Sequence, residues 1–529
     1  MMRTIIDSRT NRGLSVFEWI VAFKTTITIK ILSVALVLLS SCSQTGPGSL
    51  VPQTPGNAPD YFCTWNVQGY VDSYLSNEGQ RAAMNEKYIF GTGKNEDWVG
   101  FFPAIRNDIY FVMDDSWDIP QQINSMSNDY LGTVELDTSR FPSYTGLPEV
   151  RLKKLVTDIK AYGWKGVGGW ICAQEALSHG KVDQKTYWIE RLKAANSAGF
   201  VYWKVDWGEQ ANNADWRRMI TDLGQKYAPN LIIEHAMQMK YIEFSDAFRT
   251  YDVENVISQP VTIQRIAELL NFKAQGNAKG IINCEDEPYI AVGLGCAIGI
   301  MRHPFNGSLP NGTQDFAFPP VGHDLKNRMD EVVRAVKWHR IAKPFGVGSV
   351  PFEKDSVKLT DYWILGERET WMPGRHAGDT LTATTPGRVS RGLPLPGISN
   401  LHSPDQPIVL ASKYPNGAVT VVTIGRSLGR KYSIKRENVT VKLSGITDIV
   451  GVFGDYKELV LEFPEKINQN KIIIYGQDLA GEIPVNLTKR VIIDDNKLVI
   501  PGDLIREIGL MAATKGDLSD PGMILKIIL

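Results

Sequence analysis

Short apolar runs alternate with longer amphipathic segments from about residue 60 to residue 345, and this alternation constrains the fold more than any other feature. Seven runs read as β-strands because they are rich in β-branched or aromatic residues and end in polar ones. These seven runs are Tyr61–Trp65, Asp108–Met113, Gly166–Trp170, Phe200–Trp203, Asn230–Ile233, Ala247–Thr250 and Gly280–Asn283. We expect an eighth strand near Lys343–Val347.

The segments between these runs have the periodicity of amphipathic helices. They include Glu149–Tyr162, Gln184–Ala198, Asp215–Tyr227, Ile263–Phe272 and Leu325–Ala342. Strands that alternate with helices build a parallel sheet, and eight such units in about 280 residues fit a closed barrel. The sequence therefore predicts an α/β fold, with a (β/α)₈ TIM barrel over residues 60–345.

After residue 345 the pattern changes to short strands separated by Gly, Pro, Asn and Asp, which is typical of an all-β structure. The clearest strand candidates are Ile408–Ala411, Ala418–Ile424, Val439–Leu443, Glu458–Phe463 and Lys471–Tyr475. The segment Asp494–Leu529 is less regular, and we assign it to the same region. We expect residues 346–529 to form a β-sandwich.

The N-terminus has the pattern of an export signal. The apolar run Ile31–Leu39 follows several basic residues and is too short to span a bilayer. Leu39-Ser40-Ser41-Cys42 resembles the site at which bacterial lipoproteins are cleaved and acylated on cysteine. We expect residues 1–42 to be a signal peptide, Cys42 to carry the lipid, and residues 43–59 to be a flexible tether. The expected location is the bacterial cell envelope, with this anchor as the protein's contact with the membrane.

Composition favours a neutral ligand. The formal charge is −1, with 57 basic and 58 acidic residues, so no strong field attracts nucleic acid or anionic lipid. The 13 Trp and 19 Tyr residues are a mild excess, and several stand beside carboxylates, where sugar rings can stack. The expected ligand is a carbohydrate. The four cysteines after Cys42 show no CxxC spacing, and we expect most of them to be buried thiols.

Acidic residues close several of the predicted strands. They stand in the segments Met113–Trp117, Trp203–Gly208, Glu234–His235, Arg249–Asp252 and Glu285–Glu287. In a TIM barrel the carboxyl ends of the strands form the active site, so these acids are expected to meet at one mouth. Lys204 and Arg249 place two cations among the acids and argue against a metal site. We expect neither a metal ion nor a cofactor.

Paired carboxylates suit glycoside cleavage, in which one acts as nucleophile and the other as acid and then base. Asp206 fits the nucleophile, because strand alternation places it on the same face as Lys204, whose charge favours the ionised form. Asp252 fits the acid/base. Asp246 is the chief alternative to Asp252, and Glu243 and Glu254 also lie close in the sequence.

At these residues the chain resembles the clan of α-galactosidases and α-N-acetylgalactosaminidases, the melibiase-like glycoside hydrolases. Trp203-Lys204-Val205-Asp206 is similar to the strand-four motif that carries the nucleophile. Met113–Trp117 is similar to the strand-two motif whose acids bind galactose hydroxyls. Arg249–Glu254 is similar to the segment with the acid/base, Glu234 to a strand-five Glu, and Trp65 to a first-strand Trp.

The chain also departs from that clan. His235–Met239 stands where one branch has a run of glycines, and Cys284–Tyr289 matches the strand-seven segment only loosely. From the residues and the resemblance together, the expected catalytic pair is Asp206 and Asp252. The expected substrate-binding residues are Trp65, Asp114, Asp115, Trp170, Lys204, Glu234 and Arg249.

The resemblance implies a retaining exo-glycosidase, with α-galactosidase as the first expectation. Within the clan, β-L-arabinopyranosidase and α-N-acetylgalactosaminidase are the alternatives. From other classes, a glycan-binding surface lipoprotein on a barrel without activity and a metal-dependent hydrolase remain open. The sequence does not indicate the oligomeric state.

Overall fold

The computed structural model describes residues 47–123, 128–250, 256–313, 323–367, 374–445 and 447–529. Ser49–Leu529 forms one compact unit. The predicted signal peptide, Cys42 and part of the predicted tether lie outside the described residues, so export and lipidation stay predictions. None of the helices in the described ranges has the length and the apolar character needed to cross a membrane.

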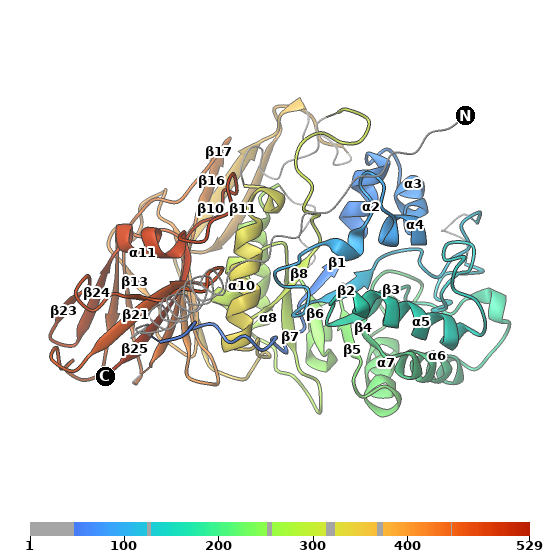
Figure 1. Cartoon of the computed structure of the whole chain (residues 1–529), viewed down its shortest axis with the longest axis horizontal. Coiled ribbons are helices and arrows are strands. Elements are labelled where there is room, and N and C mark those ends of the chain that lie inside the picture. The colour runs from blue at the N-terminus through green and yellow to red at the C-terminus, as the bar shows by residue number, and fades with distance from the viewer. Residues whose placement is uncertain (1–46, 124–127, 251–255, 314–322, 368–373, 446) are drawn as a thin grey trace, which may run out of the picture. The chain divides into compact units, whose positions relative to one another are not determined.

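Eight parallel strands form a closed barrel in sequence order, which confirms the predicted (β/α)₈ architecture (Figure 1). The strands are β1 (Tyr61–Cys63), β2 (Tyr110–Met113), β3 (Gly166–Ile171), β4 (Phe200–Val205), β5 (Ile232–His235), β6 (Ala247–Arg249), β7 (Ile281–Glu285) and β8 (Ala297–Ile300). Hydrogen-bonded pairing of β1 with β8 closes the ring.

Side chains alternate between the two faces of each barrel strand, as the pleat requires. Phe62, Phe111 and Trp203 face outward and belong to the large core beneath the helices. Tyr61, Tyr110 and Tyr202 face inward and pack together inside the barrel. The strands are therefore buried on both faces, which explains why they appear in the sequence as short apolar runs.

Helices follow most of the barrel strands and cover the outside of the barrel. They are α2 (Trp65–Asp72), α3 (Asn77–Ala82), α4 (Glu86–Phe90), α5 (Pro148–Ala161), α6 (Gln184–Ala198), α7 (Ala214–Tyr227), α8 (Ser258–Leu269), α9 (Pro288–Gly293) and α10 (Met329–Ile341). Short polar residues cap the amino ends of four of them, α3, α4, α6 and α7. Asp183 accepts a hydrogen bond from the Thr186 amide before α6, and Asn213 accepts from the Asp215 and Trp216 amides before α7.

The predicted position of the eighth strand is wrong. Residues 343–347 form a connecting segment, and β8 lies about 45 residues earlier. In the sequence, α9 and β8 merge into one apolar stretch, Tyr289–Met301, in which no periodicity separates a short buried helix from a short buried strand. Closure of the barrel against β1 selects Ala297–Ile300 as the strand.

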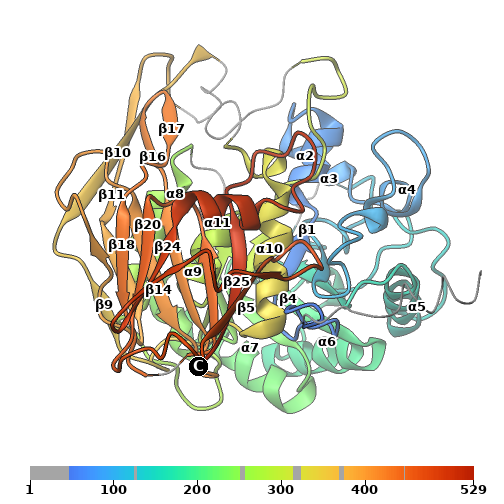
Figure 2. The same cartoon turned by 60° about the vertical axis from the view of Figure 1, so that its left-hand side comes forward.

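The C-terminal region contains three sheets and one helix, α11 (Gly502–Gly509). The larger two sheets face each other across a shared apolar core and form the expected sandwich (Figure 2). The eight-stranded sheet contains β9 (Phe352–Lys354), β12 (Arg388–Arg391), β14 (Ile408–Lys413), β15 (Val419–Ile424), β19 (Ile449–Phe453), β21 (Ile473–Asp478), β22 (Val485–Asn486) and β25 (Gly522–Ile528). The five-stranded sheet contains β13 (Gly397–Ile398), β18 (Asn438–Lys442), β20 (Glu458–Glu462), β23 (Ile492–Asp494) and β24 (Lys497–Pro501).

A third sheet of four strands, β10 (Lys358–Ile364), β11 (Thr380–Pro386), β16 (Arg426–Gly429) and β17 (Lys431–Ser433), adds to the sandwich. Its β11 packs against α8 of the barrel. The irregular segment after Asp494 belongs to the sandwich, as expected, because β25 pairs with both β19 and β21 in the larger sheet.

The barrel and the sandwich share buried polar contacts as well as an apolar core. The hydroxyl groups of Tyr414 and Thr420 both donate to the carbonyl of Val292 in α9, at 2.7 and 2.9 Å. The guanidinium group of Arg391, which is fully buried, donates to the carbonyls of Leu294, Phe345 and Gly346. Arg391 therefore connects β12 to the segment between α9 and β8 and to the segment that follows α10.

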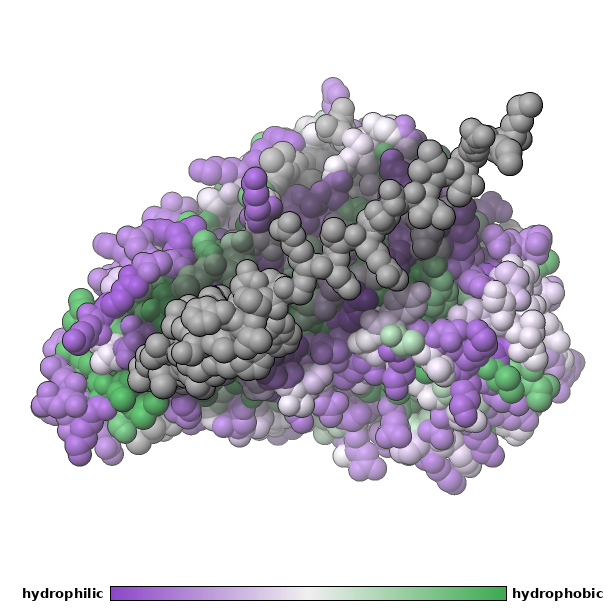
Figure 3. All heavy atoms as spheres, viewed as in Figure 1, coloured by the Kyte–Doolittle hydropathy of each residue, from purple (hydrophilic) through white to green (hydrophobic). Residues whose placement is uncertain are grey.

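The face of the molecule seen in Figure 3 is mostly hydrophilic outside its grey atoms. Hydrophobic residues appear on it in patches, the clearest at the sandwich end where the chain terminates (Figures 1 and 3). Exposed apolar residues of the C-terminal region include Ile473, Ile483, Ile492, Ile528 and Leu529. Scattered exposed apolar side chains are normal on a soluble surface.

We expect Arg391→Met to lower the free energy of unfolding by about 2–4 kcal/mol, because the substitution leaves buried carbonyl groups without donors. Urea unfolding followed by tryptophan fluorescence measures the loss. Arg490→Met is the matched control, because Arg490 makes an exposed ion pair with Glu507. An equal loss in the two variants would show that Arg391 contributes no more than a surface charge.

Candidate active site

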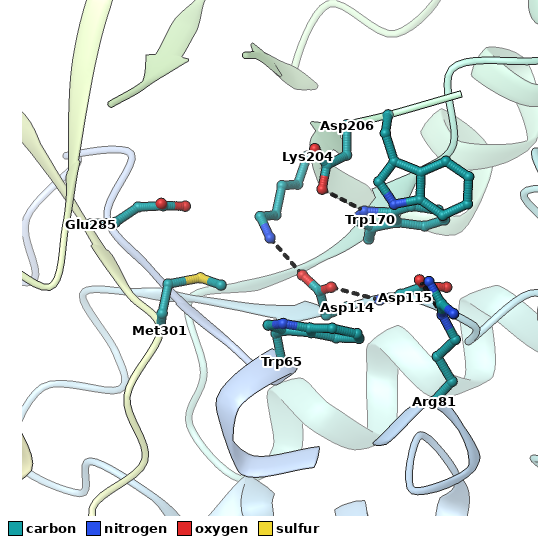
Figure 4. A pocket seen from close by; sticks show the side chains of 10 residues that line it. Trp65, Arg81, Asp114, Asp115, Trp170, Lys204, Asp206, Glu285 and Met301 are labelled. Carbon is teal, nitrogen blue, oxygen red and sulfur yellow. Dashed lines mark hydrogen bonds and ion pairs between the residues drawn. The ribbon is translucent and has the colours of Figure 1, made fainter. Parts of the chain in front are cut away.

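A pocket opens at the carboxyl ends of the barrel strands, where the acidic strand ends were expected to meet (Figure 4). Its lining consists of Trp65, Arg81, Asp114, Asp115, Trp170, Lys204, Asp206, Trp207, Glu285 and Met301. The cavity measures about 120 Å³. This volume has room for several groups of the size of a water molecule.

Asp206 follows β4 directly and is held by three other elements. The indole Nε1 of Trp170 on β3 donates to Asp206 Oδ2 at 2.9 Å, and the guanidinium of Arg249 on β6 donates to Oδ1 at 2.9 Å. Arg217 of α7 donates to the Asp206 backbone carbonyl at 2.7 Å. Both the side chain and the backbone of Asp206 are therefore fixed.

The surroundings keep Asp206 ionised. Burial on its own would raise the pKa of this carboxyl group, but the positive charges of Arg249 and Lys204 and the hydrogen bond from Trp170 outweigh it. Together they hold the pKa of Asp206 below its usual value. The result is a buried carboxylate that stays charged at neutral pH and lines a cavity.

Lys204 forms the centre of a second group of side chains. Its ammonium group lies 2.6 Å from Asp114 Oδ2, and the Cys63 thiol donates to the same oxygen at 2.7 Å. Burial would lower the pKa of Lys204, yet the charge of Asp114 raises it above the ordinary value, so the ammonium form persists. The pair spans β2 and β4, and Figure 4 shows it beside the carboxylate of Asp206.

Asp115 pairs with a residue from the long connection between β1 and β2. Arg81 of α3 donates through Nε to Asp115 Oδ2 at 2.7 Å. Burial raises the pKa of Asp115, while the charge of Arg81 opposes the rise. Trp65 and Trp207, both partly exposed, complete the polar wall with aromatic surface. Aromatic faces beside carboxylates suit a sugar ring.

Glu234 and Arg249 do not line the pocket. Both are buried inside the barrel, with Arg249 Nη1 3.4 Å from Glu234 Oε1. Glu234 also accepts hydrogen bonds from Tyr61 at 3.3 Å, Tyr202 at 2.7 Å and Asn283 at 2.5 Å. These contacts place Glu234 beneath the site, where it holds Arg249 in position. A direct contact of either residue with substrate stays a prediction.

Four lining residues were not among the expected substrate-binding residues: Arg81, Trp207, Met301 and Glu285, the last of which was expected at the mouth only as one of the acids that close the strands. Trp207 and Glu285 carried a usable signal, because each stands where a predicted strand ends. Met301 follows β8, whose position was predicted wrongly. Arg81 comes from a helix between two strands, and no pattern in the sequence marks it as part of a site.

The structure separates Asp246, the chief alternative acid/base, from this pocket. Asp246 precedes β6 and so lies at the amino end of the barrel strands. It accepts a hydrogen bond from the Ile233 amide at 3.2 Å and lies 3.5 Å from the Lys279 ammonium. Asp252 and Glu254 lie outside the described residues, so the choice of Asp252 as acid/base stays a prediction.

The residues that the structure describes contain no group of three or more His, Cys, Asp or Glu side chains that could hold a metal ion. Cys63, Cys172, Cys284 and Cys296 are free and buried, as expected for most of them. The chemical groups that line the pocket are carboxylates, two cations, indole rings and one thioether. They can bind hydroxyl groups and present a fixed carboxylate to an electrophile.

Comparison with known proteins leaves the family open. No protein-family description and no curated protein match the chain. Solved structures that align with it include an α-galactosidase from Mortierella vinacea, with 13% identity, 89% of this chain and 96% of that chain covered, and a TM-score of 0.36. A second is an α-galactosidase from Saccharomyces cerevisiae with raffinose, with 9% identity, coverage of 90% and 97%, and a TM-score of 0.39.

A third is a β-L-arabinopyranosidase from Geobacillus stearothermophilus, with 9% identity, coverage of 89% and 98%, and a TM-score of 0.37. All three TM-scores are below 0.5 and all three identities are far below 25%. These likenesses therefore establish neither the family nor the activity.

We expect Arg249→Met to destabilise the protein by about 3–5 kcal/mol, because it leaves buried acidic groups without their cation. Chemical denaturation measures the loss. Lys466→Met is the control, since Lys466 makes an exposed ion pair with Asp495, and its loss should be clearly smaller. Equal losses would mean that Arg249 does not hold the acids together.

Proposed function

We propose that this protein is an exo-acting glycoside hydrolase that retains configuration and uses Asp206 as its nucleophile. The observation that carries the proposal is the state of Asp206: a buried, ionised carboxylate, oriented by Trp170 and Arg249, in a pocket lined by acids, cations and indole rings. Asp114 and Lys204 offer an acceptor and a donor for sugar hydroxyls, and Trp65 offers an apolar face.

In the proposed reaction, a carboxylate oxygen of Asp206 attacks the anomeric carbon while the bond to the leaving oxygen breaks. Asp252 donates a proton to that oxygen. It then takes a proton from water as the water displaces Asp206, so that the sugar leaves with its original configuration. Arg249 and Trp170 stabilise the charged form of Asp206, in which it attacks and to which it returns when it departs.

We further propose that the sugar is a terminal α-linked galactose. The support is the resemblance of Trp203–Asp206 and Met113–Trp117 to the corresponding motifs of α-galactosidases. β-L-Arabinopyranosidase and α-N-acetylgalactosaminidase activities require the same catalytic groups and differ in the space around C5 or C2 of the sugar. A pocket that binds sugar without cleaving it remains the alternative from another class.

We expect the protein from residue 43 onward to release nitrophenol from one of four aryl glycosides: α-galactoside, β-L-arabinopyranoside, α-N-acetylgalactosaminide or α-glucoside. Asp206→Asn should lower kcat by at least roughly 10³-fold, because it removes the nucleophile. Asp246→Asn, which removes a buried acid at the other end of the barrel, is the matched control and should retain activity. Sugar binding without any cleavage would contradict the enzymatic proposal and favour the binding protein.

We also expect Trp170→Phe to shift the acidic limb of the kcat/KM profile to higher pH. The substitution removes the indole donor that favours the charged form of Asp206, so its pKa rises and the active carboxylate disappears at a higher pH. The change should appear on the acidic side of the usual carboxyl range, because the pKa of Asp206 starts below its ordinary value. An unchanged acidic limb would mean that Asp206 does not set it.

A further inference from the structure

Glu285 lines the pocket, but the proposed reaction of Asp206 and Asp252 does not use it. It is the last residue of β7, and its side chain is buried. Figure 4 shows its carboxyl group reaching into the pocket from the side opposite Trp170, toward Lys204. Any sugar in the pocket that lies against Asp206 and Asp114 therefore has Glu285 at its edge.

A buried carboxylate needs hydrogen-bond donors, and within the described part of the chain Glu285 has none. Its Oε2 atom is buried and has no hydrogen-bond partner. Its Oε1 atom lies 3.7 Å from Arg249 Nε, which is too long for a hydrogen bond. An unsatisfied charged oxygen is costly in a buried site, so the carboxyl group favours its neutral form.

The electrostatic surroundings agree with this geometry. Burial raises the pKa of Glu285 to about 8, although the positive charges of Arg249 and Lys204 oppose the rise. The charged and titratable groups that face it come from every side of the barrel: Tyr61 of β1, Lys204 of β4, Glu234 of β5, Arg249 of β6 and Asp286 after β7. Asp114 and Asp206 share the pocket with it.

We propose that Glu285 is a substrate-binding residue whose neutral carboxyl group donates a hydrogen bond to a ring hydroxyl of the sugar in the pocket. A neutral carboxyl group both donates and accepts, as a sugar hydroxyl does, whereas the carboxylates of Asp114 and Asp206 only accept. The inference rests on the proposed function, because it assumes that the ligand is a sugar.

The test is the pH dependence of KM and kcat for the glycoside that the protein cleaves, compared among wild type, Glu285→Gln and Glu285→Ala. In the wild type, KM should rise above pH 8 by up to tenfold per pH unit, since the ionised group cannot donate. Glu285→Gln keeps a donor and an acceptor at all pH values. Its KM should stay level from pH 7 to 9.5 and its kcat should stay within about threefold of wild type.

Glu285→Ala should raise KM at least tenfold at pH 7 and also lose the alkaline rise. The matched control is Asp118→Asn. Burial raises the pKa of Asp118 to about 7, but this residue is not part of the pocket lining, so the alkaline rise in KM should remain. Circular dichroism and the melting temperature establish that each variant is folded.

Three outcomes would overturn the proposal. If Glu285→Gln keeps the alkaline rise in KM, another group causes it. If Glu285→Gln loses kcat by 10³-fold or more at constant KM, Glu285 transfers a proton in the reaction and does not serve to bind the sugar. If Glu285→Ala binds and reacts like the wild type, the residue does not contact the substrate.

Failure of the proposed function gives a different result. If wild type cleaves no glycoside, titration with D-galactose, followed by tryptophan fluorescence at pH 7 and 9.5, replaces the kinetic assay. Galactose affinity that falls at pH 9.5 in wild type but not in Glu285→Gln supports the role of Glu285 even though catalysis is absent. Galactose affinity that is the same at both pH values, or absent in both proteins, overturns it.

Discussion

The site depends on one buried guanidinium group, that of Arg249. It faces Asp206 after β4, Glu234 on β5 and Glu285 on β7, at distances of 2.9, 3.4 and 3.7 Å. Burial would lower the pKa of Arg249, but the three acids raise it above its ordinary value. Each acid would be costly to bury without the cation, and the cation would be costly to bury without the acids. β4, β5, β6 and β7 are consecutive neighbours in the barrel sheet, and this pairing brings the four groups together.

Geometry then gives the acids different properties within one small space. Asp206 receives hydrogen bonds from Trp170 and Arg249 and remains charged. Glu285 receives none within the described residues, lies slightly farther from the same guanidinium, and favours the neutral form. The difference lies in the number of donors that reach each group. In one pocket, the charged carboxylate of Asp206 can attack a sugar carbon, and the neutral carboxyl group of Glu285 can donate to a sugar hydroxyl.

The sandwich contributes to the site indirectly. It binds α9, the segment between α9 and β8, and the segment after α10 through Arg391, Tyr414 and Thr420. Glu285 stands just before α9 and Met301 just after β8, so these contacts support the part of the barrel that completes the pocket. The C-terminal region thus stabilises the pocket from outside the barrel, and all the lining residues among those that the structure describes come from the barrel.

The sequence by itself determined the strand–helix alternation, the change to short strands after the barrel, and the acids that close the strands, because these are local patterns of period and composition. Tertiary structure alone decided which strand closes the barrel, because α9 and β8 are one apolar run in the sequence. It also decided that Arg81 enters the pocket, that Asp246 lies at the opposite end, and that Glu234 and Arg249 lie beneath the pocket. Burial and hydrogen-bond partners come from residues far apart in the chain, and they fix which acids are charged.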